Sequence, residues 1–308
     1  MKIGLSLSEP APGGDVLGAL TSSIQQAADD GFSSAWLANI FGLDALTALA
    51  VAGSSVPGIE LGTAVVPTYP RHPGALAQQA LTVQAALGGR LALGIGLSHQ
   101  VVIEGMYGLS FDKPARHMKE YLEILLPLLD TGRVSYEGEA LTARMGLTRA
   151  SEERVPVYLA AMAPRMLHLA GAVAEGTILW MTGPQTIESH VLPKLRAAAE
   201  EAGRPSPRVV CVLPVAVTDD PAAARAHADQ AFRIYNDLPS YRAMLDIEGA
   251  AGPGDVAVVG DEDAVGEQVA ALAEMGVTDF VAGAFATGDD AERTRALLSS
   301  LATEAAAG

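Results

Sequence analysis

The chain has 308 residues, 49% of them hydrophobic, so it can bury a large core as one α/β domain or as two smaller ones. Its 20 Lys and Arg against 36 Asp and Glu give a formal net charge of −16, and the resulting long-range field repels nucleic acid and anionic membranes. We therefore expect no nucleic acid and no membrane among its partners.

A single cysteine, Cys211, excludes an internal disulfide and a cysteine-rich zinc site, and its apolar neighbours indicate a core position. The N-terminus enters an apolar run directly, without the features of a signal peptide. No apolar run approaches the roughly 20 residues of a membrane-spanning helix. We expect a cytoplasmic protein that has no metal site.

Short apolar runs alternate with segments of helical periodicity along nearly the whole chain. Strands are predicted at residues 3–7, 35–38, 59–66, 90–96, 155–161, 177–181, 208–217 and 279–285. Helices are predicted at residues 17–30, 44–52, 73–87, 112–129, 164–173, 185–202, 221–238, 265–274 and 289–301. Two regions depart from this alternation: an insertion at about 97–150, with a hairpin or an irregular excursion at 133–147, and an irregular segment at about 239–260.

About eight strand–helix units over this length predict a (β/α)8 TIM barrel, as a single domain over residues 1–308 with inserted segments at the C-terminal rim. An open doubly wound sheet would give the same alternation. However, Leu7-Ser8-Glu9-Pro10 follows the first strand, where a dinucleotide-binding sheet would have Gly-x-Gly-x-x-Gly. The barrel is therefore the preferred fold.

Two predicted strand ends look like the floor of a binding site. The run at 59–66 stops in small residues before Pro67, and the run at 90–96 ends in Gly94 and Gly96, followed by Ser98 and His99. In a barrel the chemistry lies at these C-terminal strand ends. The predicted rim is poor in catalytic residue types, so the chemistry is expected to come from an organic cofactor.

The segment from Ala160 to Arg165 ends the fifth strand and opens a helix with Pro164 in its first turn. Backbone N–H groups at a helix start have no partner within the helix, and the helix dipole favours an anion there. Arg165 adds a positive charge. This segment is a candidate phosphate site, and its alternative role is an ordinary helix start with an exposed Arg.

Several motifs in this order resemble the bacterial luciferase-like oxidoreductase superfamily, and most closely its actinobacterial branch that uses the deazaflavin coenzyme F420. The resemblance covers nearly the whole chain. The motifs are Met1-Lys2-Ile3-Gly4-Leu5, Gly62-Thr63-Ala64-Val65-Val66-Pro67, Arg90-Leu91-Ala92-Leu93-Gly94-Ile95-Gly96-Leu97-Ser98-His99, Pro114-Ala115-Arg116-His117-Met118-Lys119-Glu120-Tyr121-Leu122, and Pro156-Val157-Tyr158-Leu159-Ala160-Ala161 with Pro164-Arg165.

The resemblance implies a barrel whose cofactor lies at the C-terminal ends of the strands. It implies a non-prolyl cis peptide at Ala64-Val65, forming a bulge behind the cofactor ring. It also implies cofactor contacts from Gly96, Leu97 and Ser98, and phosphate contacts from the segment that begins at Ala161, made by Met162, Ala163, Arg165 and Met166. Relatives often have Gly where this chain has Met162.

One departure from the family concerns catalysis. Relatives commonly carry Asp followed by a catalytic His where this chain has Asn39 and Ile40, so the reaction of the deazaflavin-dependent sugar-phosphate dehydrogenases does not carry over. Asn39 is expected either to bond the cofactor ring or to cap the next turn. His99 lies near the position of a catalytic Glu in those dehydrogenases and is our candidate acid/base, or else a polar residue that shapes the groove.

Further residues have weaker roles. Tyr107 in the long loop and Trp180 at the sixth strand end are candidates for the substrate pocket, although Trp180 could equally pack in the core. Arg71 and His72 are expected to be structural. Arg116 and His117 are expected to form intramolecular ion pairs.

We expect an enzyme that passes a hydride between C5 of F420 and a small organic substrate, reducing a C=C or C=N bond. One alternative is an FMN-dependent monooxygenase on the same fold. The other is a non-catalytic flavin- or deazaflavin-binding protein. A homodimer is expected by resemblance.

Overall fold

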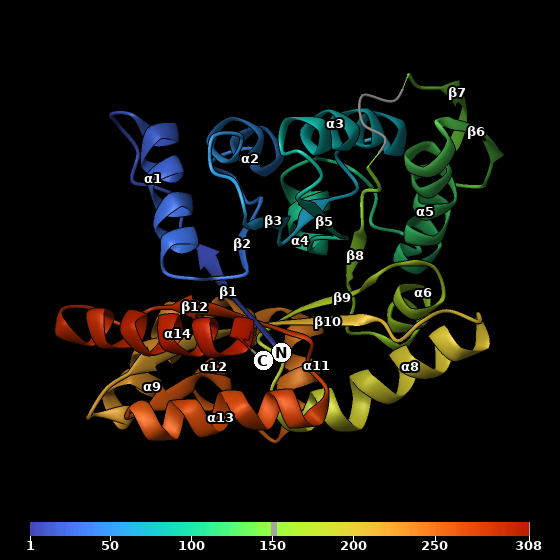
Figure 1. Ribbon diagram of the computed structural model, residues 1–308. Helices are drawn as coiled ribbons and strands as arrows, with labels where there is room; N and C mark the ends of the chain where they lie inside the picture. The colour runs from blue at the N-terminus through green and yellow to red at the C-terminus, as the bar shows by residue number, and fades with distance from the viewer. Residues whose placement is uncertain (149–152, 308) are drawn as a thin grey trace. The chain divides into compact units, whose positions relative to one another are not determined.

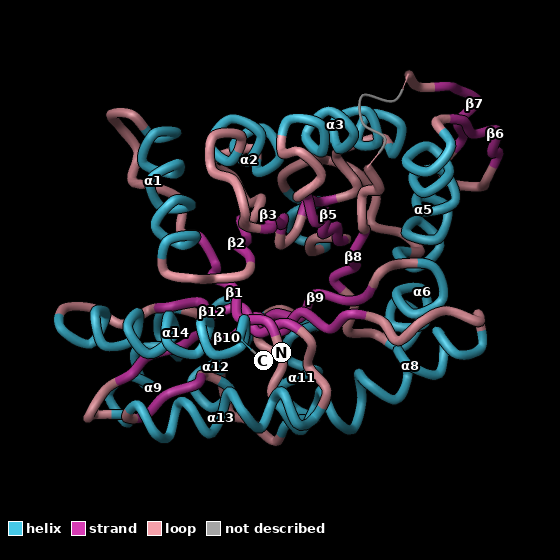
Figure 2. Tube along the Cα trace, in the orientation of Figure 1, coloured by secondary structure: helices cyan, strands magenta, loops and turns pink. Residues whose placement is uncertain are grey.

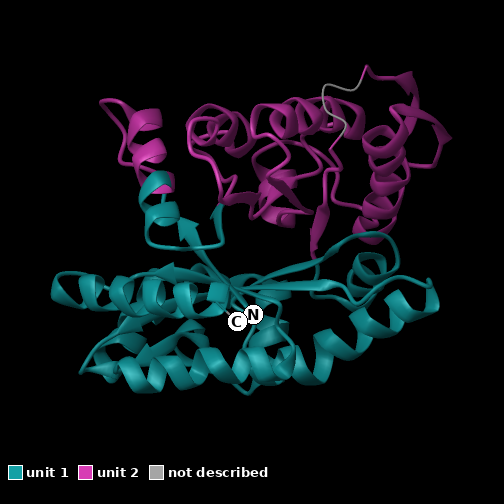
Figure 3. Ribbon diagram, in the orientation of Figure 1, with its two compact units in different colours: residues 1–8, 25–36, 161–308 teal, residues 9–24, 37–160 magenta. Residues whose placement is uncertain are grey.

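The computed structural model describes residues 1–148 and 153–307, and the chain divides into two compact units (Figure 3). Unit 1 takes in residues 1–8, 25–36 and 161–308, and unit 2 residues 9–24 and 37–160. The predicted single domain over residues 1–308 stays a prediction. Residues 149 and 150, at the end of the predicted insertion, lie outside the described residues.

The sheet of unit 1 consists of parallel strands. β10 pairs with β9 on one side and with β12 on the other, and β12 pairs with β1. Every residue of β10 after its first is buried, as expected for a parallel strand that is covered on both faces. The strands are β1 (Lys2–Leu7), β9 (Gly176–Trp180), β10 (Arg208–Val217), β11 (Val258–Gly260) and β12 (Asp279–Ala284), with most of β2 (Ser34–Leu37).

Helices cover this sheet, and α14 packs against β1, β10 and β12 (Figures 1 and 2). A π-helical turn, η1 (Ile187–Val191), joins α7 to α8. The helices of unit 1 are α6 (Pro164–Val173), α7 (Pro184–Thr186), α8 (Leu192–Glu201), α9 (Pro221–Ala231), α10 (Ile234–Asp237), α11 (Pro239–Glu248), α12 (Pro253–Val256), α13 (Glu262–Met275) and α14 (Asp289–Ala307), and α1 (Val16–Asp29) contributes to both units.

In unit 2, β5 pairs in parallel with β3, β4 and β8, and α3 packs against α5. An antiparallel hairpin of β6 and β7 follows α5, which is one of the two alternatives left open for residues 133–147. The elements are α2 (Ala45–Gly53), β3 (Glu60–Thr63), β4 (Val66–Pro67), α3 (Pro73–Ala86), β5 (Leu91–Gly96), α4 (Gln100–Gly105), α5 (Pro114–Thr131), β6 (Arg133–Glu137), β7 (Thr142–Gly146) and β8 (Val157–Ala160).

The fold is a (β/α)8 barrel of the kind predicted. Its eight parallel strands are β1, β2, β3, β5, β8, β9, β10 and β12, and the long insertion with α4, α5 and the hairpin follows β5. None of the described helices has both the length and the apolar character that crossing a membrane requires.

Local differences from the predicted elements have physical reasons. The strand predicted at 59–66 stops at Thr63 and resumes at Val66, on either side of a cis peptide. The segment predicted to be irregular at 239–260 forms α11, α12 and the three-residue β11. Elements this short are stabilised by their neighbours more than by their own periodicity, so their pattern is weak.

Candidate functional site

The end of β3 is held tightly to β5. The Thr63 hydroxyl donates to the Gly94 carbonyl at 2.8 Å and accepts from the Gly94 N–H at 2.9 Å. The next peptide, Ala64-Val65, is cis, which confirms the prediction for this bond. Both side chains are half-buried, so this strand end presents them partly to solvent.

Gly96 lets two neighbouring strand ends approach its backbone. A Cβ at this position would lie 2.7 Å from Val65 Cγ2 and 3.1 Å from Ala160 Cβ, which is too close for an ordinary contact. A side chain at Gly96 would therefore displace Val65 or Ala160. The sequence indicated that Gly96 leaves room for a ligand against the strand. In the structure, its missing side chain instead allows Val65 and Ala160 to pack closely against it.

The segment after β5 has a special backbone. Ser98 has φ of 61°, a left-handed conformation that is uncommon for residues other than glycine and is often found at functional positions. The His99 carbonyl begins α4 by accepting from the N–H groups of Val102 and Ile103. The His99 ring does not cap this helix, and its half-buried position lowers the pKa of the imidazole.

Asn39 follows β2 and its side chain is engaged locally. Its Oδ1 accepts from the Ala45 N–H at 3.0 Å, at the first residue of α2. This is the capping role left open by the sequence, and it holds the loop on which Ile40 is 59% exposed. The Asn39 amide nitrogen is not used in that bond.

Arg71 and His72 have the structural roles predicted for them. Arg71 pairs with Asp44, the residue that caps α2. His72 Nδ1 accepts from the Gly74 N–H at the start of α3, so its Nε2 carries the proton and donates to the Thr142 carbonyl at 3.2 Å. These contacts fasten α2, α3 and the hairpin to one loop.

His117 differs from its prediction. Arg116 does form an ion pair, with Glu139, but His117 is buried and bonds the Thr68 hydroxyl at 3.1 Å. Its ring lies flat on Tyr69, with centroids 3.9 Å apart. Burial lowers the pKa of His117 to about 4, so the ring is neutral at pH 7. The expected ion pair is therefore wrong for this residue, because the attraction of Glu120 is too weak to offset the cost of burying a charged ring.

Tyr69 also belongs to this cluster and was missed by sequence reasoning. Its hydroxyl is buried without a hydrogen-bond partner among the described residues, and burial, with Asp112 and Glu104 nearby, raises its pKa to about 12. The neighbouring Thr68 N–H donates to the Gly96 carbonyl at 2.9 Å, so the cluster adjoins the end of β5. The only sequence signal was its position just after Pro67.

In unit 1 the segment Ala161–Met166 starts α6 as predicted. Ala163 is the N-cap and has no side chain that could satisfy the helix donors, and Pro164 occupies the first turn. Arg165 is exposed, whereas Ala161 and Met166 are buried. The helix start thus offers backbone donors and a cation to an anion.

Two side chains outside this segment contact Met162, and a third, Lys194, contacts one of them; sequence reasoning missed all three. His190 Nε2 lies 2.8 Å from the Met162 carbonyl oxygen, and Lys194 Nζ lies 3.2 Å from His190 Nδ1. The Thr182 hydroxyl lies 3.8 Å from Met162 Sδ. All three are distant in sequence, so no local motif points to them.

Trp180 ends β9 and is half-buried. It packs edge-to-face on Phe232 and Tyr235, with centroids 5.6 and 5.8 Å away, beside a core cluster that contains Met181. Tyr107 is 44% exposed in the turn after α4. These positions leave both pocket assignments as predictions.

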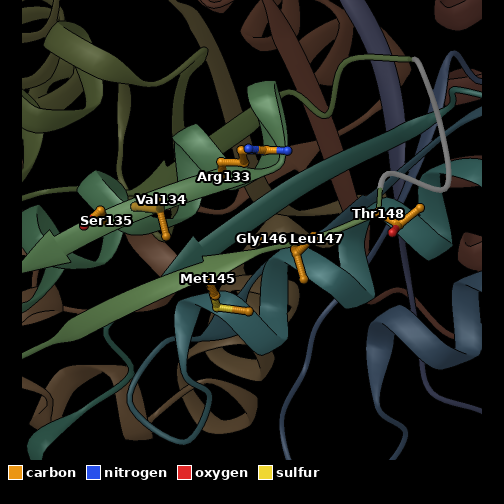
Figure 4. A pocket seen from close by; sticks show the side chains of 7 residues that line it. All are labelled: Arg133, Val134, Ser135, Met145, Gly146, Leu147 and Thr148. Carbon is orange, nitrogen blue, oxygen red and sulfur yellow. The ribbon is translucent and has the colours of Figure 1, made fainter.

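One open pocket of about 590 Å³ lies on the hairpin of unit 2 (Figure 4). None of the predicted site residues lines it. Its lining residues are Arg133, Val134, Ser135, Met145, Gly146, Leu147 and Thr148. The pocket is therefore distinct from the candidate cofactor residues.

The sequence is similar to known proteins over most of its length. The family described as luciferase-like monooxygenase matches residues 1–279. A Mycobacterium tuberculosis protein assigned as a coenzyme F420-dependent oxidoreductase is 32% identical over 225 residues, which cover 66% of this chain and 63% of the relative. The 5,10-methylenetetrahydromethanopterin reductase of Methanolobus tindarius is 27% identical, covering 83% of this chain and 87% of the relative.

A solved structure supports the fold. The coenzyme F420-dependent tetrahydromethanopterin reductase of Methanopyrus kandleri has a TM-score of 0.79 to this chain, covers 97% of both chains and is 23% identical. At this identity the likeness shows the barrel fold and nothing finer.

Proposed function

Since the chain belongs to the luciferase-like monooxygenase family, we propose that it is an oxidoreductase that uses coenzyme F420. The relative from Mycobacterium tuberculosis and the structural neighbour both carry this cofactor in their names. The observation that carries the proposal is the start of α6, where Ala163 leaves the helix donors without a side-chain cap and Arg165 is exposed. This donor set fits the phosphate of such a cofactor.

The remaining candidate residues are assigned to the ring and to the phosphate of the cofactor. We expect Ala64, Val65 and the segment Gly96–Ser98 to contact the deazaflavin ring, with Asn39 offering its amide nitrogen. We expect Ala161, Met162, Ala163, Arg165 and Met166 to hold the phosphate. No acidic side chain lies within residues 161–166, so the segment does not repel an anion.

The proposed reaction is the transfer of a hydride between the cofactor and a small organic substrate. When bound, F420 supplies or accepts a hydride at C5 of its ring. We propose that a conjugated C=C or C=N bond of a small organic substrate is reduced, with Tyr107 and Trp180 lining the substrate pocket. His99 then gives the proton that completes the reduction.

Cofactor binding tests the proposal directly. Purified protein titrated with F420 or with FMN should quench the fluorescence of F420 at lower concentrations than that of FMN. Oxidation of reduced F420 should then appear across a panel of enones and imines. Tight FMN binding with no F420 binding would contradict the proposal and favour a flavin-dependent monooxygenase.

Two alternatives are decided by the same measurements. A monooxygenase would consume oxygen in the presence of reduced FMN and substrate. A non-catalytic binding protein would bind a cofactor but never oxidise it over a broad panel. We also propose a homodimer, which light scattering of the purified protein would test.

A further inference from the structure

The π-helical turn η1 in unit 1 places His190 against the loop that precedes α6. Nothing in the sequence around His190 predicts this contact. His190 lies in η1, and its Nε2 is 2.8 Å from the carbonyl oxygen of Met162, 28 residues earlier. A π-helical turn shifts the side chains that follow it around the helix, and such turns are frequent at functional positions. The contact between His190 and the Met162 carbonyl therefore depends on the π-helical turn.

Lys194 determines which ring nitrogen of His190 carries the proton. Its Nζ lies 3.2 Å from His190 Nδ1 and also donates to the His190 carbonyl at 3.0 Å. An ammonium group has donors only, so Nδ1 must accept and Nε2 must carry the hydrogen. His190 is thus set up to donate to the Met162 carbonyl.

Fixing this carbonyl also fixes the N–H on the other side of the same peptide. The Met162-Ala163 peptide is trans, so the Ala163 N–H points opposite to the Met162 carbonyl and away from His190. Ala163 is the N-cap of α6, where the N–H groups of Ala163 and Arg165 have no partner within the helix. A flip of this peptide would replace a donor with a carbonyl oxygen, which repels an anion.

We infer that His190 and Lys194 are positioning residues that orient the Met162-Ala163 peptide so that its N–H faces a phosphate at the start of α6. The inference rests on the proposed function, because that function supplies the phosphate. Thr182, 3.8 Å from Met162 Sδ, restrains the side chain of the same residue.

The test compares a cofactor with and without its phosphate. The dissociation constants of F420 and of the deazaflavin that ends at its ribityl hydroxyl are measured by fluorescence quenching. The ratio is the dissociation constant of the phosphate-free form divided by that of F420, and it reports on the phosphate together with the tail that the phosphate carries. We expect His190→Ala to reduce this ratio by about tenfold, since one oriented hydrogen bond is lost, and to leave binding of the phosphate-free form unchanged.

Further variants separate orientation from folding. His190→Gln keeps an N–H donor near the Nε2 position and should keep the ratio within about threefold of the wild type. Lys194→Met removes the group that fixes the tautomer and should reduce the ratio by about threefold. His168→Ala, an exposed position on α6, is the matched control and should change nothing. Melting temperatures check the fold, and Lys194→Met and His190→Gln decide the question if His190→Ala does not fold.

Each result has one meaning. A wild-type ratio in His190→Ala, or equal weakening of both ligands, overturns the inference and leaves the proposed function in place. If the wild type binds neither F420 nor its phosphate-free form, FMN and riboflavin provide the same ratio for the alternative cofactor. If neither pair binds, the inference and the proposed function both fail.

Discussion

Burial of the His99 ring lowers its pKa below the usual value of 6.5, so most molecules carry a neutral imidazole at pH 7. A neutral ring accepts a proton readily but is a poor donor. In the proposed direction of reduction, the active form is the minor, protonated one. The environment of His99 thus ties the direction of the reaction to pH.

The rate of substrate reduction should therefore depend on the protonation of His99. We expect kcat for reduction to rise as the pH falls from 8 towards the lowered pKa of His99, and His99→Gln to remove this dependence. Stopped-flow oxidation of reduced F420 by an enone at several pH values would measure it. Full turnover of His99→Gln with an unchanged pH profile would eliminate His99 as the proton donor.

At the level of single residues, sequence reasoning worked where the chemistry is local. The structural role of His72 was predicted from its neighbours in the chain, whereas the cis peptide at Ala64-Val65 was predicted from the family resemblance. His117 was misjudged because its partner Thr68 lies 49 residues away and its burial depends on tertiary packing. His190 could not be found from the sequence for the same reason.

Among the elements, the hairpin of β6 and β7 depends on one buried carboxylate of α5. Glu120 accepts from the backbone N–H groups of Glu139, Ala140 and Leu141 at 2.8 to 3.1 Å. Burial alone would raise the pKa of Glu120, but these hydrogen bonds, with Arg116, lower it. A Cβ at Gly138 would lie 2.3 Å from Glu120 Oε2, so a side chain here would displace the carboxylate from the turn.

Glu120→Gln should loosen the hairpin. The amide has one acceptor oxygen, and its NH2 group would face the same backbone donors, so we expect a loss of about 2 kcal/mol in the free energy of unfolding. Amide hydrogen exchange at Ala140 and Leu141 should become faster. Glu123→Gln, an exposed position on the same helix, is the control. Unchanged exchange at both amides would show that the carboxylate does not anchor the turn.

Hydrophobic periodicity was enough to predict the long elements but not the short or irregular ones. Strands such as β10 and helices such as α3 were recognisable from apolar runs and helical spacing, because each buries a whole face. The π-helical turn η1 was not, since its sequence is compatible with a regular helix and only the packing around it selects the extra residue. The same holds for β11, a strand of three residues.

At the scale of the whole molecule, the net charge of −16 favours solubility near neutral pH. Acidification removes this net charge only when the carboxyl groups are protonated, mostly below pH 5. A loss of stability that begins at a higher pH must come from other groups. The buried His117 is such a group, because its pKa is lowered to about 4.

The free energy of unfolding should therefore fall between pH 6.5 and about pH 4. In this window the unfolded chain binds a proton at His117 and the folded chain does not, so acidification favours unfolding by up to about 3 kcal/mol. Glu120 reduces this loss of stability, because its charge attracts the proton to His117. His99, whose pKa is also lowered, increases the loss of stability.

The variant His117→Phe keeps a ring on Tyr69. It should reduce the slope of the free energy of unfolding against pH by up to one proton, and it should lose the hydrogen bond to Thr68 at every pH. Urea unfolding at half-unit pH steps measures the slope, with the exposed His168→Gln as control; equal slopes for wild type and His117→Phe would show that His117 is protonated in the folded protein.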